Sequence, residues 1–305
     1  MFDLVIIGGG PAGISAGVYA SRKQLKTLFV TKEWGGQSTV SPDIQNWIGT
    51  PHISGDELAR TLEAHLREYA GEFVTIANGL VTKVTKTDDG FVTALENGDT
   101  HTSKAVLIAT GSVRRKLEAI NAETYDNKGL TYCATCDGPL FGGQDVVVIG
   151  GGNAAFETAA QLLAYAKSVT LLHRSETFKA DPVTVERVLA NPHMKAFTCA
   201  KTTEILGDKF VTGIKYTDKD GVEHTLSTAG VFVEIGMVPN TEYVADLVEL
   251  DEYNRVKIDP WTQQTNVKGV WAAGDCTNIK YHQNNISAGD AVRALEDIYV
   301  NLKAK

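Results

Sequence analysis

The pair of cysteines in "TYCATCDGPL" (residues 131–140) is the part of the chain best suited to chemistry. Cys133 and Cys136 are separated by two residues, a spacing that allows a small disulfide ring and lowers the pKa of one thiol. Asp137 follows directly and could carry the proton exchanged when thiol and thiolate interconvert. An aspartate before Gly138 and Pro139 is also an ordinary turn residue, so the sequence leaves both interpretations of Asp137 open.

A metal site and a structural staple are the alternatives for these cysteines. A zinc site needs four ligands, but the chain has no second C-x-x-C pair, and the nearest downstream histidines, His173 and His193, lack metal-ligand spacing. Four cysteines are too few for the disulfide scaffold of a secreted protein. We therefore expect a redox dithiol and no metal. The other two, Cys199 and Cys276, should be small buried side chains.

Two glycine-rich loops follow strand-like apolar runs and are each followed by a helical stretch and a second strand. The loops read Gly8-x-Gly10-x-x-Gly13 and Gly150-x-Gly152-x-x-Ala155. In such loops the first glycine permits a tight turn, the second lets the backbone approach a pyrophosphate, and the third position must be small. The helix N-terminus then offers N–H groups to the phosphates. One loop could be a simple turn, but two copies in this context predict two dinucleotides.

The residues after each loop indicate which nucleotide it holds. Glu33 lies about 20 residues beyond the first loop, where an acid binds a ribose hydroxyl, which suits an adenosine without a 2′-phosphate such as that of FAD. The second loop is followed by "HRSETFK". His173, Arg174 and Lys179 place cations where a 2′-phosphate would lie, which favours NADPH. The alternative for these three is a solvated basic loop.

Strand and helix signals alternate along the chain and predict an α/β fold. Ser54 and Glu57 have capping-box spacing at the start of a segment in which leucines recur every four residues, which predicts an amphipathic helix. We expect two Rossmann-like, three-layer dinucleotide-binding domains, with the second inserted into the first. The FAD domain would comprise residues 1–113 and 243–305, and the NAD(P)H domain, with the cysteine pair, residues 114–242.

The composition of the chain limits which classes of partner and which cellular locations are expected. The chain of 305 residues has 29 basic and 37 acidic side chains, hence a net charge of −8, which argues against nucleic acid and anionic membranes as partners. It contains no apolar run near the roughly 18 residues of a membrane helix. The beginning, "MFDLVIIGGG", lacks the basic region and cleavage site of a signal peptide. We therefore expect a cytoplasmic protein.

The combination of two nucleotide loops with a dithiol just before the second resembles the low-molecular-weight thioredoxin reductases over nearly the whole chain. The matching segments are "GGGPAG", "GGQS", "NWIG", "ATG", "CATCDG", "GGGNAAFE", "HR" and "AAGD…YHQNNISAG". The segments "WGGQ", "TYC…CDGPLF" and "TNVKGVWAAGDCT" are similar to the flavoprotein subunit of alkyl hydroperoxide reductase. That family carries two N-terminal thioredoxin-like folds, whereas this chain starts at the FAD strand, so its electrons should go to a separate protein.

The resemblance implies a homodimer, a rotation between the domains, and roles for individual residues. Cys136 would be the thiol near the flavin, Cys133 would attack the partner's disulfide, and Asp137 would be the acid–base group. The implied FAD site comprises Gly8, Gly10, Pro11, Ala12, Gly13, Glu33, Gly36, Gln37, Asn46, Thr110, Gly111, Gly274, Asp275, Gln283 and Asn284. The implied NADPH site comprises Gly150, Gly152, Asn153, Ala155, Glu157, His173, Arg174 and Lys179.

The chain departs from the thioredoxin reductase pattern H-R-R-x-x-x-R in the segment "HRSETFK". Ser175 and Lys179 replace two arginines, and lysine keeps charge but lacks the bidentate fork that suits phosphate. The hydroperoxide reductase relatives lack this cluster and use NADH. NADPH is our prediction, and NADH is its alternative.

The expected reaction is therefore disulfide reduction in a thioredoxin-like or glutaredoxin-like protein. One alternative is an NADH-dependent reductase of a glutaredoxin-like or peroxiredoxin-system partner. Flavin reductases and ferredoxin-linked enzymes on the same scaffold lack the C-x-x-C pair, which counts against them here. A non-catalytic, flavin-dependent redox sensor would bind cofactor without turnover.

Overall fold

The computed structural model describes residues 1–41 and 43–303, and these divide into two compact units. Unit 1 comprises Met1–Val113 and Val238–Lys305, and unit 2 comprises Arg114–Met237. The sequence placed the return to the first unit at residue 243, whereas the structure places it at Val238. The segment 238–242 therefore belongs to unit 1.

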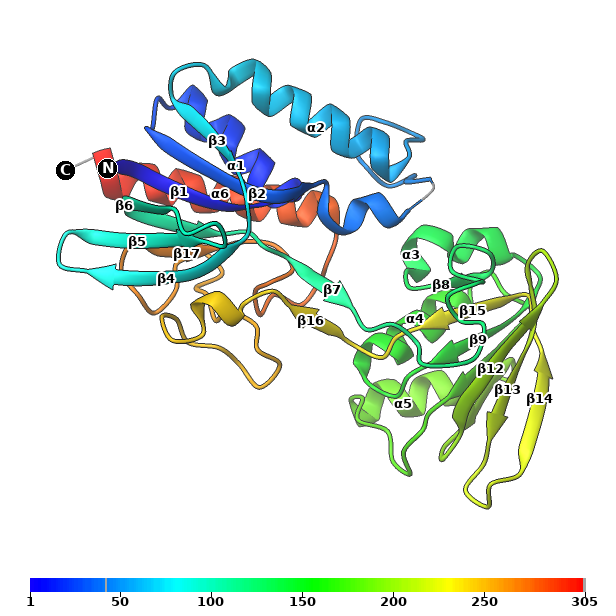
Figure 1. Cartoon of the computed structure of the whole chain (residues 1–305). Helices are drawn as coiled ribbons and strands as arrows, with labels where there is room; N and C mark the ends of the chain where they lie inside the picture. Colours follow the sequence, from blue (N-terminus) through cyan, green and yellow to red (C-terminus); the bar gives the residue numbers. More distant parts are fainter. Residues whose placement is uncertain (42, 304–305) are drawn as a thin grey trace. The chain divides into compact units, whose positions relative to one another are not determined.

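Unit 1 is built on a seven-stranded sheet of order β3-β2-β1-β6-β5-β4, in which β17 also pairs with β6 (Figure 1). Its strands are β1 (Phe2–Gly9), β2 (Thr27–Trp34), β3 (Val74–Asn78), β4 (Val81–Thr87), β5 (Gly90–Leu95), β6 (Thr100–Ile108) and β17 (Val270–Ala272). The strands β1, β2, β3, β6 and β17 are parallel, while β4 and β5 form an antiparallel extension. The first glycine loop follows β1 at the carboxyl edge of the parallel strands.

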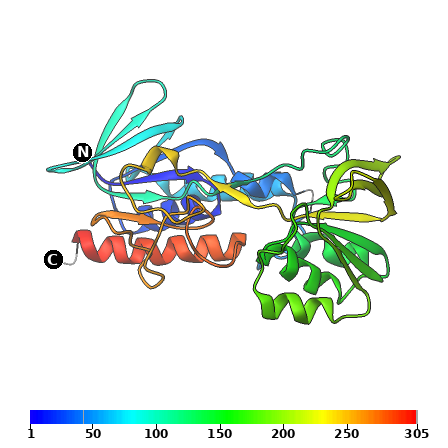
Figure 2. The same cartoon turned by 90° about the horizontal axis from the view of Figure 1, so that it is seen from below.

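Alternating side chains of β1 enter two separate cores, as expected for a sheet covered on both faces. Leu4 and Ile6 join a cluster with the helices, and Val5 and Ile7 join a cluster on the other face. The helices are α1 (Pro11–Arg22), α2 (Gly55–Ala70) and α6 (Asn284–Lys303). Helix α1 packs against both α2 and α6, and Figure 2 shows α6 (red) running beneath the strands of this unit. Ser54 caps α2 by accepting a hydrogen bond from the N–H of Glu57, as predicted.

Unit 2 contains a parallel sheet of order β11-β10-β9-β15-β8 and a three-stranded antiparallel sheet of order β12-β13-β14. The parallel strands are β8 (Leu130–Thr131), β9 (Asp145–Ile149), β10 (Ser168–Leu172), β11 (Met194–Phe197) and β15 (Gly230–Val233). The antiparallel strands are β12 (Lys201–Gly207), β13 (Val211–Thr217) and β14 (Glu223–Ser227). The helices are α3 (Ala134–Asp137), α4 (Asn153–Leu162) and α5 (Pro182–Leu189).

The two faces of this parallel sheet are covered differently, which gives unit 2 three layers. Val146 and Val148 of β9 pack with Phe156 of α4 and Val188 of α5. Val147, on the opposite face, packs with the residues of β12 and β13, among them Ile205, Val211 and Ile214. The antiparallel sheet therefore occupies the place where a second pair of helices would otherwise cover the strands.

Short elements complete the chain. The strands β7 (Ser112–Arg114) and β16 (Met237–Pro239) pair with each other where the chain passes between the units, and the 3-10 helices are η1 (Gly36–Val40), η2 (Gly138–Phe141) and η3 (Glu242–Val244). None of the helices within residues 1–41 and 43–303 has the length and apolarity needed to span a bilayer.

Candidate functional site

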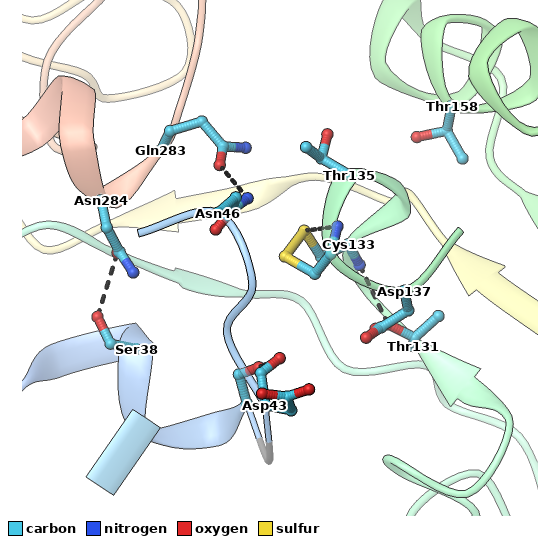
Figure 3. The surroundings of a disulfide bond; sticks show 12 residues. Ser38, Asp43, Asn46, Thr131, Cys133, Thr135, Asp137, Thr158, Gln283 and Asn284 are labelled. Atoms are coloured by element: carbon cyan, nitrogen blue, oxygen red, sulfur yellow. Dashed lines mark hydrogen bonds between the residues drawn. A yellow bond between two sulfur atoms is a disulfide. The ribbon is translucent and has the colours of Figure 1, made fainter. Parts of the chain in front are cut away.

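Cys133 and Cys136 form a disulfide with a Cα–Cα distance of 5.3 Å (Figure 3). Cys133 is the N-cap of the one-turn helix α3, and its Sγ accepts a hydrogen bond of 3.2 Å from the N–H of Cys136. Both cysteines are partly exposed. The disulfide is therefore not fully buried.

Asp137 directly follows Cys136, and its carboxyl group accepts a hydrogen bond from the hydroxyl of Thr131 (Figure 3). Burial raises the pKa of Asp137 above its ordinary value, while the bond from Thr131 and the charge of Arg114 act in the opposite direction. The side chain does not cap η2, which starts at the next residue. A carboxyl group with a raised pKa on the residue that follows Cys136 is suited to proton transfer, which favours the acid–base interpretation over the turn interpretation.

Thr131 also accepts a hydrogen bond of 3.3 Å from the N–H of Cys133, so one hydroxyl holds both the acid and the start of the dithiol segment. It is buried at the end of β8. The sequence did not predict a role for this residue, because a threonine two positions before a cysteine carries no signal until the turn that brings Asp137 back to it is known.

The first glycine loop has the geometry that its spacing predicts. Gly8 has a φ of +124°, and a Cβ atom there would lie 2.2 Å from the carbonyl oxygen of Ala109. A Cβ at Gly13 would lie 1.8 Å from the carbonyl oxygen of Gly8, whereas one at Gly10 would meet nothing within 4 Å. Gly8 and Gly13 are therefore required by close packing, and the space over Gly10 is open to a ligand.

A cavity of about 840 Å³ opens over this loop within unit 1. Of the residues predicted for the FAD site, those lining it are Gly8, Gly10, Pro11, Ala12, Glu33, Gly36, Gln37, Thr110, Gly111, Asp275 and Asn284. Its size falls within the range of about 300–1,000 Å³ that is typical of cofactor sites. The glycine loop at the N-terminus of α1, the open space and Glu33 fit the phosphates and ribose of a dinucleotide.

Four predicted residues of this site, Gly13, Asn46, Gly274 and Gln283, do not line the cavity. Gly13 lies beneath the loop, and Gly274, with a φ of +78°, approaches Ala12. Asn46 donates a hydrogen bond of 3.1 Å to the amide oxygen of Gln283 (Figure 3).

Other polar contacts fix side chains of the cavity wall. Ser287 donates a hydrogen bond of 3.1 Å to Asp275, which sets the orientation of this carboxylate. Ser38 donates one of 3.1 Å to Asn284. Several lining residues were not predicted from the sequence, namely Thr31, Lys32, Ser38, Leu80, Thr82, Tyr243 and Ser287. Leu80, Thr82 and Tyr243 come from segments without a nucleotide motif, and only the tertiary fold brings them here.

The second glycine loop repeats this pattern in unit 2. Gly150 has a φ of +152°, and a Cβ there would lie 2.3 Å from the carbonyl oxygen of Glu234. Ala155 is fully buried, and a Cβ at Gly152 would meet nothing within 4 Å. Asn153 accepts a hydrogen bond of 2.7 Å from the N–H of Asp181, and Glu157 is exposed on α4.

The structure corrects the role expected for His173. Its ring is buried beneath Gly151, where a Cβ would lie 2.2 Å from the ring nitrogen, and its Nε2 contacts the carbonyl oxygen of Thr177 at 3.0 Å. His173 therefore shapes the loop and does not offer a surface cation to a 2′-phosphate. Arg174 and Lys179 are exposed.

The two other cysteines differ from each other. Cys276 is fully buried, as expected, and burial raises the pKa of its thiol to about 12. Cys199 is only partly buried and has a φ of +52°, so the expectation of burial was wrong for this residue. A group of three or more histidine, cysteine, aspartate or glutamate side chains able to hold a metal is absent from the part of the chain that the structure describes.

Two dinucleotide-type loops, each at the carboxyl edge of a parallel sheet, together with a disulfide beside an acid, define a nucleotide-dependent oxidoreductase. Comparison with known proteins supports this class of enzyme. The family described as pyridine nucleotide-disulphide oxidoreductase matches residues 2–289. Among solved structures, thioredoxin reductase from Giardia duodenalis has a TM-score of 0.94 at 31% identity, and that from Streptococcus pyogenes 0.91 at 33%; each comparison covers 100% of this chain and 99% of the other.

Curated sequences extend the comparison. An alkyl hydroperoxide reductase component from Staphylococcus aureus (strain MRSA252) is 42% identical over 294 residues, which are 96% of this chain and 57% of that protein. A protein named NADH dehydrogenase from Ferdinandcohnia aciditolerans is 40% identical over 96% of this chain and 56% of its own length. The chain thus spans somewhat more than half the length of these relatives.

The chain belongs to the pyridine nucleotide-disulphide oxidoreductase family. The resemblance to low-molecular-weight thioredoxin reductases and to the hydroperoxide reductase flavoprotein is confirmed, and so is the α/β fold with two Rossmann-like units. The protein is an oxidoreductase of the flavoprotein disulfide reductase class, which implies a flavin and a nicotinamide cofactor.

Proposed function

We propose that the protein passes electrons from NADPH through FAD and the Cys133–Cys136 disulfide to the disulfide of a separate thioredoxin-like or glutaredoxin-like protein. The observation that carries the proposal is the partly exposed Cys133–Cys136 disulfide, followed directly by Asp137, whose carboxyl is held by Thr131. Burial raises the pKa of Asp137, which suits this carboxyl to exchange protons with the thiols and thiolates of the dithiol.

The cavity of unit 1 supports FAD as the flavin. N–H groups at the start of α1 and the open space at Gly10 would receive the pyrophosphate, and Glu33 would bind the adenosine ribose. Gln37, Asp275 and Asn284, which line the same cavity, would contact the flavin half. When bound, FAD supplies a carrier that accepts a hydride from nicotinamide and delivers two electrons to a disulfide.

Arg174 and Lys179 support NADPH, because both are exposed after β10, where the adenosine ribose would lie. One observation favours NADH as the second candidate: His173 is withdrawn under the loop, so the cluster has fewer surface cations than expected. Competition between the two nucleotides for the protein separates these candidates.

The dithiol step follows from the two sulfur atoms and one acid. Two electrons and two protons convert the disulfide to two thiols. The Cys133 thiolate then attacks the partner's disulfide and forms a mixed disulfide, and Cys136 attacks Cys133 to release the partner as a dithiol. Asp137 would donate a proton to a departing thiolate and recover it from water.

We also propose a homodimer in the cytoplasm, without nucleic acid or membrane as partners. The net charge of −8 supports the proposal that nucleic acid and membranes are not partners. Light scattering of the purified protein tests the dimer. Because a curated relative is a component of alkyl hydroperoxide reductase, a peroxiredoxin-system partner is the alternative to thioredoxin, and each is to be tested as a substrate.

The substitution Cys136→Ser tests the proposed path. The variant should lose reduction of thioredoxin, glutaredoxin or peroxiredoxin and keep reduction of its flavin by NADPH. Cys199→Ser is a matched control, because this partly exposed cysteine lies outside the disulfide, and both activities should survive. Continued partner reduction by Cys136→Ser would show that the dithiol assignment is wrong.

A further inference from the structure

Glu234 is a carboxyl group that the proposed dithiol chemistry does not use. It is the first residue after β15, and its N–H donates a hydrogen bond of 2.8 Å to the carbonyl oxygen of Ile149, the last residue of β9. Its own carbonyl lies against Gly150, where only a glycine leaves room. Glu234 therefore sits at the carboxyl edge of the sheet, beside the first glycine of the second loop.

This position is a topological switch point. From β9 the chain runs outward to β10 and β11 and then returns on the opposite side of β9 as β15. Ligands of such sheets bind in the crevice outside the carboxyl ends of the two strands where the order reverses. Here those strands are β9 and β15.

The direction of a bound dinucleotide follows from the proposed function, on which this inference rests. The loop from Gly150 to Gly152 would take the pyrophosphate, and Arg174, after β10, would mark the adenosine half. The nicotinamide half then extends to the other side of β9, over the end of β15. Glu234 is the acidic residue at that end.

The carboxyl of Glu234 is held in place and is close to its ionisation point at neutral pH. It accepts a hydrogen bond of 2.9 Å from Thr158, a buried residue of α4. Burial raises the pKa of Glu234 to about 7, and the nearby charge of Glu157 acts in the same direction. Thr158 and the charge of Arg114 oppose the rise. The ring of His173, which lies against the neighbouring Gly151, is engaged with the carbonyl oxygen of Thr177.

The two redox states of nicotinamide differ in charge, because the oxidised ring is positive and the reduced ring is neutral. We propose that Glu234 is a positioning residue for the nicotinamide half and that its carboxylate favours the oxidised nucleotide, so that binding of this form releases a proton. A cation near the carboxyl favours the charged form. By linkage, the oxidised nucleotide binds more tightly as pH rises to about 7 and above.

The test is the binding of NADP⁺ and NAD⁺ to the full-length flavoprotein by titration calorimetry between about pH 5.5 and about pH 8.5. Fragments without the ring, 2′-phospho-ADP-ribose and ADP-ribose, serve as references. If binding lowers the pKa of Glu234 by one unit, affinity for the oxidised nucleotide rises by up to about tenfold over this range relative to its fragment. Buffers of different ionisation enthalpy count the released proton directly.

Three variants separate Glu234 from general effects of pH. Glu234→Gln keeps the shape but not the charge, so the pH dependence and the proton release should vanish. Thr158→Val removes a hydrogen bond that lowers the pKa of Glu234, so the rise in affinity should move to higher pH. Glu186→Gln, at an exposed position of α5, should behave like the parent protein.

The outcomes distinguish this inference from the proposed function. Binding with the predicted pH dependence, lost in Glu234→Gln, supports the inference. Binding with the same pH dependence in Glu234→Gln and in the parent protein overturns the inference alone. If neither NADP⁺ nor NAD⁺ binds, the proposed function fails and the inference fails with it.

Discussion

At the scale of single residues, the chemistry depends on how Asp137 is held beside the disulfide. Burial raises its pKa, and the hydroxyl of Thr131 partly offsets this effect by donating to the carboxylate. The same hydroxyl oxygen accepts a hydrogen bond from the N–H of Cys133. Thr131 therefore links the protonation of the acid to the conformation of the dithiol segment.

The substitution Thr131→Val should raise the pKa of Asp137 further, because it removes a hydrogen bond that favours the charged form. The limb of the pH profile of kcat/KM for partner reduction that reports Asp137 should move to higher pH. Thr131→Ser keeps the hydroxyl and should keep the parent profile. Identical profiles for the valine and serine variants would show that the hydroxyl does not tune this acid.

The substitution Asp137→Asn should slow partner reduction by about 10²- to 10⁴-fold, the usual contribution of a positioned acid or base. Reduction of the flavin by NADPH should be unchanged, because this step does not need a proton at the dithiol. Steady-state turnover with thioredoxin and rapid-reaction absorbance of the flavin measure the two steps. An equal loss in both would mean that Asp137 has a structural role.

At the scale of elements, each glycine loop contains two kinds of position. At some positions a small residue is required by close backbone packing, and at others the absence of a side chain leaves space for a ligand. Gly13 is packed against the backbone of Gly8, while Gly10 and Gly152 face open space. Spacing alone predicted this division, because the roles of the three positions follow from the geometry of a strand–turn–helix unit.

Gly13→Ala and Gly10→Ala form a matched pair that tests this division. Gly13→Ala should lower the free energy of unfolding by on the order of 3 kcal/mol, because its Cβ would overlap a backbone carbonyl. Gly10→Ala should change that free energy by less than about 1 kcal/mol and reduce the FAD content of the purified protein. Denaturant unfolding of FAD-free samples and flavin absorbance are the measurements. Equal stability losses would contradict the assignment of Gly10 to a ligand.

How far the sequence predicts the elements depends on whether their signals are local. The cap at Ser54 and both loops are formed by residues close in the chain, so the sequence was sufficient. Leu80, Thr82 and Tyr243 reach the cavity of unit 1 from distant segments, and no local pattern announces such a contact. His173 matched a phosphate-binding pattern, but its ring packs closely against Gly151 and therefore does not face a phosphate.

At the scale of the whole molecule, the chain forms two compact units, each with its own nucleotide-type loop. The sequence placed the second passage between them at residue 243, and the segment "GVFVEIGMVPNT" (residues 230–241) contains no change of composition that marks an earlier boundary. The structure places it at Val238, within the strand β16 that pairs with β7. Such a boundary depends on long-range strand pairing.

The central claim is that nicotinamide, flavin and the Cys133–Cys136 disulfide form one electron path. The most direct measurement is an anaerobic titration of the purified flavoprotein with NADPH, and in parallel with NADH, followed by flavin absorbance and thiol content. The account predicts that the better nucleotide is consumed at about two equivalents per flavin, with two new thiols. Consumption that stops at one equivalent per flavin, with thiols unchanged, would contradict it.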